Sequence, residues 1–184
     1  TVPGYQVVKQ DSVGPQVGNE LQKKGLLAVG ISLLGMIIYI SWRFEFAFAM
    51  GAVVALIHDV LACIGIFCLL GRQLNMTTIA AVLTIIGYSV NDTIVIFDRI
   101  REDMKLYRGR SFKDIANLSI NQTLGRTILT SFTSMITVVA LLVFGGGAIF
   151  DFALALFVGM VSGVYSTVYV ATPVVMFWHN EKKV

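Results

Sequence analysis

Five long apolar segments leave this chain few folds to adopt. They cover residues 25–42, 46–70, 76–97, 127–144 and 152–178 of the 184. Each is about 18 residues or longer, which as an α-helix crosses the roughly 30 Å hydrocarbon core of a bilayer. Hydrocarbon offers no partners for backbone N–H and C=O groups, so spanning segments must be helical. With 56% hydrophobic residues, the sequence predicts an all-α polytopic membrane protein with five transmembrane helices.

The segments around these spans are polar. Residues 1–24 contain Gly and Pro and are predicted to be the end of a domain outside the membrane, followed by a linker. The chain begins at Thr1 and not at Met, so we expect the front of a longer protein to precede it. Residues 98–122 form the longest connection, and residues 179–184 form a tail. Residues 25–178 are therefore predicted to be a transmembrane helix bundle.

The long connection carries a helix signal. Ser111 followed by Asp114 is similar to a capping box, and apolar residues follow at near-helical spacing. This pattern predicts a short helix lying on the cytoplasmic membrane surface. A solvated basic loop that only fixes the topology is the alternative.

The distribution of basic residues predicts the orientation. Ten of the fourteen lie in the Arg43 turn, in residues 98–126 and in the tail, and four lie on the other side: Lys9, Lys23, Lys24 and Arg72. The positive-inside rule then places the N-terminal segment outside and the C-terminus in the cytoplasm. Because these cations lie close to helix ends, they indicate contacts with lipid headgroups and no role in binding nucleic acid.

Asp92 lies in the third span, residues 76–97, as the only charged residue of that segment. An Asp near mid-membrane costs roughly 2.5 to 3.5 kcal/mol on insertion scales, so a helix that retains one usually has a partner or a proton to supply. Tyr88 and Asn91 share its helix face by i, i+3 and i+4 spacing. The pattern predicts a proton or ion pathway, and a structural hydrogen-bonding role for Asp92 is the alternative.

A stripe of hydroxyl residues lies along one side of the fourth span. This span, with its polar first turn, is expected to begin at about residue 123. It includes Thr130 and Ser131, and Arg126 lies at its cytoplasmic end. The third and fourth spans run antiparallel, and Asp92 lies about 9 Å below the inner interface, near the level of Arg126. We therefore expect the guanidinium to reach toward the carboxylate. For any single hydroxyl, bonding back to its own helix is the alternative.

Two further features lie in the second and last spans. His58 and Asp59 are near the midplane, but neighbours in a helix point about 100° apart, so they cannot both face one site squarely. A structural role for His58 and a proton-relay role are equally open.

In the last span, Gly159 and Gly163 form a GxxxG packing pair. That span is long enough to require tilt or to end early at Pro173.

No pattern of catalytic or cofactor-binding residues is found. The sequence lacks a cluster with metal-ligand spacing, a nucleophile with its base, and a phosphate-binding glycine loop. Cys63 and Cys68 are five positions apart in one span and predict neither a disulfide nor a metal site. We expect a protein that is not an enzyme and needs no cofactor or metal.

Several stretches together resemble the SecF family. The longest is GYSVNDTIVIFDRIRED at residues 87–103. The others, in order, are VGPQVG at 13–18, WRFEF at 42–46, HDV at 58–60, NQTLGRTILTS at 121–131 and GVYSTVYVATP at 163–173. This combination covers nearly the whole chain and is similar to SecF, the smaller subunit of the SecDF protein-export complex, or to the SecF half of a fused SecDF.

The resemblance implies an architecture and a mechanism. SecF-like proteins have six spans with a large extracytoplasmic α+β domain after the first, and belong to the RND superfamily of proton-driven transporters. This chain would then be a remnant of that domain followed by an RND-like half-bundle. SecDF uses the proton-motive force to assist polypeptide export through the SecYEG channel in the bacterial or archaeal cytoplasmic membrane. Asp92 and Arg126 would belong to its proton site, together with an aspartate from the partner SecD.

Two other functions remain open. A proton-coupled small-molecule exporter of the same superfamily would carry a substrate pocket in its outer domain. A passive assembly scaffold would keep its function when Asp92 is neutralised. If Asp92 carries protons in a SecF-like protein, its charged and neutral forms must be close in free energy. Burial disfavours the charged form of Asp92, and a nearby guanidinium favours it.

Overall fold

The computed structural model describes residues 15–179. The helical elements are α1 (Pro15–Arg43), α2 (Phe46–Leu69), α3 (Met76–Leu106), α4 (Phe112–Phe144), α5 (Gly147–Ser166), the π-helical turn η1 (Thr167–Ala171) and α6 (Thr172–Trp178). Within residues 15–179, five helical segments are long and apolar enough to cross a membrane. The predicted all-α fold with five transmembrane helices is therefore confirmed. Residues 1–14, where the domain remnant is expected, lie outside the described part, and residues 15–24 are the first turns of α1.

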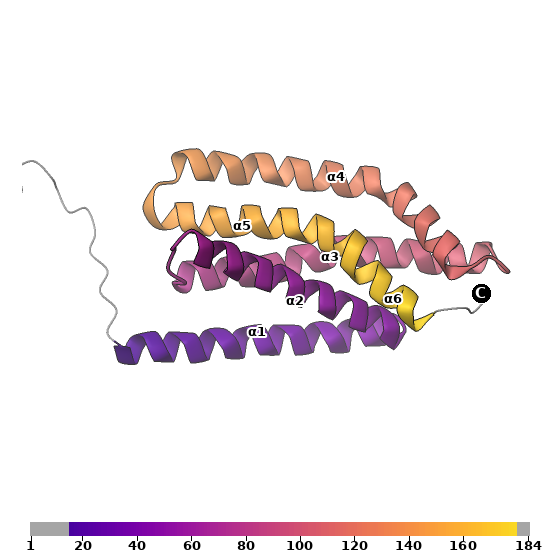
Figure 1. Ribbon diagram of the computed structural model, residues 1–184, viewed down its shortest axis with the longest axis horizontal. Helices are drawn as coiled ribbons and strands as arrows, with labels where there is room; N and C mark the ends of the chain where they lie inside the picture. The colour runs from indigo at the N-terminus through magenta and orange to yellow at the C-terminus, as the bar shows by residue number, and fades with distance from the viewer. Residues whose placement is uncertain (1–14, 180–184) are drawn as a thin grey trace, which may run out of the picture.

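The helices lie side by side along the long axis of the molecule. Figure 1 shows α1 at one edge of the bundle and α4 at the opposite edge, with α2, α3 and α5 between them. The core lies among these inner helices, where the rings of Phe48 and Phe97 pack edge to face with centroids 5.0 Å apart. The edge helices instead expose apolar side chains, such as Leu27 at 63% and Phe132 at 60%. Such surfaces suit lipid or a partner helix and not water.

The expected short surface helix is not a separate element. Ser111 caps the N-terminus of α4, because its hydroxyl accepts a hydrogen bond from the Asp114 backbone N–H at 3.2 Å. The helix then continues without a break to Phe144. Figure 1 shows its first turns bent away from the rest. The prediction of a helix start at Ser111 is thus right and that of a distinct helix is wrong, since nothing in the following residues ends the helix.

The last span does not end at Pro173. The helix continues from Ile149 to Trp178, and the π-helical turn η1 lies just before the proline. Proline lacks a backbone N–H and its ring crowds the preceding turn, and a wider π-helical turn accommodates both effects. The Thr172 hydroxyl donates to the Thr167 carbonyl oxygen at 3.2 Å and so satisfies an acceptor within this turn.

The glycine pair of the last span allows α5 to approach α3 closely. A Cβ at Gly159 would overlap the Ile85 side chain, and a Cβ at Gly163 would lie 3.2 Å from the Ser89 hydroxyl. The predicted packing role of Gly159 and Gly163 is therefore confirmed. The close approach also brings polar side chains of α3 and α5 within hydrogen-bonding distance of each other.

Candidate functional site

Asp92 is buried between α3 and α4. Its residue exposure is 7%, and the Ser131 hydroxyl of α4 donates to its Oδ2 at 3.3 Å. Ser131 is the only hydrogen-bond donor to this carboxylate within the part of the chain that the structure describes. An ionisable group this sparsely solvated inside a spanning helix is costly to keep charged, which makes Asp92 a candidate functional residue.

Most hydroxyls of the α4 stripe bond back to their own helix. Thr130 donates to the Arg126 carbonyl at 2.9 Å, and Ser134 donates to the Thr130 carbonyl at 3.0 Å. Ser131 differs, because its hydroxyl crosses to α3. Of the sequence-predicted residues on α3, Tyr88 donates to the Thr130 carbonyl at 3.4 Å, and the Asn91 position is exposed. The stripe therefore contributes one hydroxyl to Asp92. Its other hydroxyls bond back to α4, except that of Thr127, which is buried and has no hydrogen-bond partner among the described residues.

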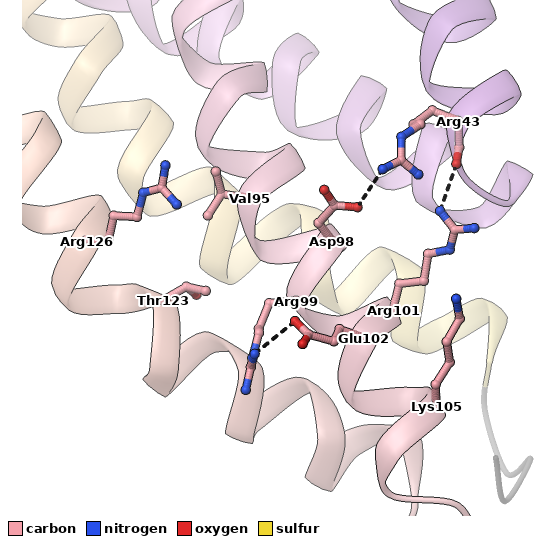
Figure 2. Close-up of a pocket in the computed structure, with 9 residues that line it drawn as sticks. All are labelled: Arg43, Val95, Asp98, Arg99, Arg101, Glu102, Lys105, Thr123 and Arg126. Carbon is pink, nitrogen blue, oxygen red and sulfur yellow. Dashed lines mark hydrogen bonds and ion pairs between the residues drawn. The ribbon is translucent and has the colours of Figure 1, made fainter.

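Arg126 lies beside a cavity of about 560 Å³ at the end of the apolar part of α4. Figure 2 shows its guanidinium on the side of the cavity that Val95 and Thr123 also line. Within residues 15–179 it makes no ion pair with a carboxylate at 4.0 Å or less, so the expected direct pair with Asp92 is not formed. The two residues are offset along the helix axis. Asp92 contacts Ser131, and Ser131 lies five residues, or about 7.5 Å, further along α4 than Arg126.

The cavity is ringed by charges from three helices (Figure 2). It is lined by Arg43 of α1, by Thr123 and Arg126 of α4, and by six residues of α3: Val95, Asp98, Arg99, Arg101, Glu102 and Lys105. Asp98 pairs with Arg43 at 3.5 Å and Glu102 pairs with Arg99 at 2.9 Å. Five cations thus line this cavity together with two carboxylates.

A second buried carboxylate is more fully bonded than the first. Asp59 of α2 is 1% exposed and accepts three hydroxyl hydrogen bonds. The donors are Ser89 of α3 at 2.6 Å and, from α5, Ser162 at 2.7 Å and Ser166 at 2.9 Å. We call Asp59 with these three serines the Asp59 cage. Because its donors come from two other helices, the cage ties α2, α3 and α5 together.

His58 lies at the edge of the Asp59 cage. Its Nδ1 is 3.3 Å from Asp59 Oδ1 and 3.5 Å from the Ser162 hydroxyl, while its side chain is 39% exposed. The ring also lies beside that of Tyr165, with centroids 5.9 Å apart. As the helical spacing predicts, only Asp59 points squarely inward. His58 nevertheless reaches the carboxylate from the side and lies within hydrogen-bonding distance of it.

Hydroxyls extend the Asp59 cage toward the π-helical turn. Thr93 donates to the Ser89 carbonyl at 3.1 Å, and its hydroxyl lies 3.0 Å from that of Thr167 in η1. Ser89, Ser162 and Ser166 are not predicted from the sequence as partners of Asp59. The available signal is the alternation of Gly and Ser at positions 159, 162, 163 and 166, which places small polar residues on one face of the last span.

Metal binding finds no support in this geometry. Among the described residues, no three His, Cys, Asp or Glu side chains lie close enough to hold an ion. What the site contains is two buried carboxylates that accept hydroxyl hydrogen bonds from neighbouring helices. A multi-pass helical membrane protein with ionisable groups inside its bundle is the class that fold and site define.

Comparison with known proteins gives the family. Residues 1–181 match the family described as "Protein export membrane protein SecD/SecF, C-terminal", and the chain belongs to this family. The protein translocase subunit SecF of Koribacter versatilis is 51% identical over 96% of this chain and 44% of its own length. SecF of Rickettsia prowazekii is 45% identical over 97% of this chain and 57% of its own. The motif-based resemblance to SecF, or to the SecF half of SecDF, is confirmed.

A solved structure agrees with the fold. The crystal structure of SecDF from Thermus thermophilus, a translocon-associated membrane protein, is 45% identical and superimposes with a TM-score of 0.87. It covers 92% of this chain, which corresponds to 24% of that chain. The chain therefore spans about half the length of its SecF relatives and about a quarter of the fused SecDF protein.

Proposed function

We propose that this chain is the membrane bundle of a SecF-type subunit that uses proton movement through Asp92 to assist protein translocation. The observation that carries the proposal is the isolation of Asp92, which is buried in a spanning helix and accepts a hydrogen bond from Ser131. A hydroxyl can donate to a carboxylate and accept from a carboxylic acid, so Ser131 fits both protonation states. The chain would act as a transporter component and not as an enzyme.

Proton movement supplies enough free energy for a conformational step. One proton crossing a membrane potential releases about 2.3 kcal/mol per 100 mV. This is comparable to the few kcal/mol that separate two conformations of a protein. The cavity beside Arg126 would give protons access from one side, and protonation of Asp92 would change how α3 and α4 pack.

A partner bundle is needed to complete the site. Exposed apolar side chains lie along α4, including Ile128, Leu129 and Phe132. We propose that a SecD subunit or a fused SecD half covers this face and brings a further ionisable group. The complex would then act beside the SecYEG translocon on the exported polypeptide, in the cytoplasmic membrane, with the C-terminus inside.

The test is Asp92→Asn in the full-length protein. The amide keeps the size and the hydrogen bond to Ser131 but cannot carry a proton. We expect proton flux in reconstituted vesicles, and export driven by it, to fall at least tenfold while the complex still assembles. Asp114→Asn makes the same chemical change at an exposed site and should leave both unchanged. Wild-type flux in Asp92→Asn would contradict the assignment and favour a passive scaffold.

A further inference from the structure

Cations from two helices meet at one membrane boundary on the α1 side of the cavity. Arg43 lies in the last turn of α1, and Arg101 and Lys105 lie on α3 just beyond its apolar run, which ends at Phe97. Figure 2 shows these three side chains together at the side of the cavity away from Arg126. They therefore lie at the depth where lipid headgroups begin.

The carboxylates near this group do not neutralise it. Asp98 pairs with Arg43, and Glu102 is held by Arg99. Within the range that the structure describes, Arg101 and Lys105 have no carboxylate oxygen within 4.0 Å. Two positive charges are thus left facing the cavity, although Glu102 follows Arg101 directly in α3.

Two guanidinium groups are held in place before any ligand binds. Arg101 Nη1 donates to the backbone carbonyl of Arg43 at 3.2 Å, which satisfies an acceptor at the end of α1. Both guanidiniums lie over the buried ring of Phe44, with Arg43 at 5.4 Å and Arg101 at 5.9 Å from its centroid. Groups fixed in this way lose little side-chain entropy when an anion binds.

We propose that Arg101 and Lys105, with Arg43 beside them, bind the phosphate of an anionic phospholipid. They are four residues apart on α3 and so present two cations on one face. A second hollow of about 390 Å³ adjoins them and is lined also by Arg108, which extends the positive surface, and by Glu45, which limits it. Glu45 is itself held 3.4 Å from the imidazole of His179.

A lipid fits this site better than a free phosphate ion does. The two hollows together offer far more room than one phosphate group, and a headgroup with its glycerol would fill more of it. Trp42, next to Arg43, is 85% exposed at the same boundary, where indole rings favour the interface. The acyl chains would then lie along the exposed apolar side of α1. The proposed lipid site lies on the α1 side of the cavity, and Arg126 lines the opposite side.

The test measures phospholipid binding to the full-length protein in its complex, by native mass spectrometry of lipid adducts. The probes are phosphatidylglycerol, phosphatidylcholine and inorganic phosphate. Each cation near a membrane surface contributes about fivefold in affinity for anionic lipid. The double variant Arg101→Gln with Lys105→Gln should therefore weaken phosphatidylglycerol binding about 25-fold and leave phosphatidylcholine binding unchanged.

The matched control removes two charges outside the cavity. Arg110→Gln with Lys113→Gln lies in the same connection at exposed positions and should change phosphatidylglycerol affinity less than twofold. An equal loss in both variants would overturn the site in favour of nonspecific attraction. Displacement of the lipid by inorganic phosphate at equal concentration would assign the site to free phosphate. Absence of bound phosphatidylglycerol in the wild-type complex would overturn the proposal.

Discussion

The Asp59 cage gives the sharpest prediction about stability. Ser162→Ala and Ser166→Ala each remove a hydroxyl that donates to a carboxylate with 1% exposure. A hydrogen bond to a charged group contributes about 1.5–3 kcal/mol in soluble proteins. Bonds between membrane helices average about 0.6 and reach about 1.7 kcal/mol. Because Asp59 cannot recruit water, we expect each substitution to lower the free energy of unfolding by about 1–2 kcal/mol.

Replacing the acceptor, Asp59, should lower the free energy of unfolding by less than removing its donors. Asp59→Asn removes the charge, and the freed serines have other acceptors, since Ser166 already lies 3.2 Å from the Gly163 carbonyl. A buried carboxylate without donors is more costly than a hydroxyl that bonds back to its helix. The double variant Ser162→Ala with Ser166→Ala should therefore be less stable than Asp59→Asn.

Unfolding by titration with a denaturing detergent, followed by circular dichroism, measures these differences. Ser134→Ala is the matched control, because this exposed hydroxyl bonds only to the carbonyl of its own helix, and its loss should change stability by less than about 0.5 kcal/mol. If Asp59→Asn proves the most destabilising change of the set, the cage does not hold a charged carboxylate. The reasoning would then be wrong.

Three shorter predictions concern the proton site, the packing and the topology. Ser131→Ala should lower proton flux about fivefold in vesicles, the effect of one hydrogen bond of about 1 kcal/mol, and unchanged flux would remove Ser131 from the route. Gly159→Ala should destabilise the bundle by about 1–3 kcal/mol through overlap with α3, whereas Gly65→Ala, which points into open space, should not. A cysteine at Gly146 should react with an impermeant reagent from outside and one at Arg108 only from inside; the reverse would overturn the proposed orientation.

The sequence by itself determined the fold class, the number of spans and the identity of Asp92 as a buried ionisable group. These properties depend on the length and polarity of contiguous segments, which can be read locally. The close packing at Gly159 and Gly163 was also readable, because their spacing places them on one helix face. The family motifs then pointed to SecF without any tertiary information.

Only the tertiary structure decided which polar groups meet. The donors to Asp59 come from α3 and α5, and no local pattern states which helices are neighbours or at what axial level they cross. Arg126 has the right depth by residue counting, yet among the described residues it lines the cavity and forms no direct ion pair with Asp92. The passage of the last span beyond Pro173 was likewise set by a π-helical turn. Hydrogen bonds between helices depend on atomic positions to within about an ångström, and only the packed bundle fixes them.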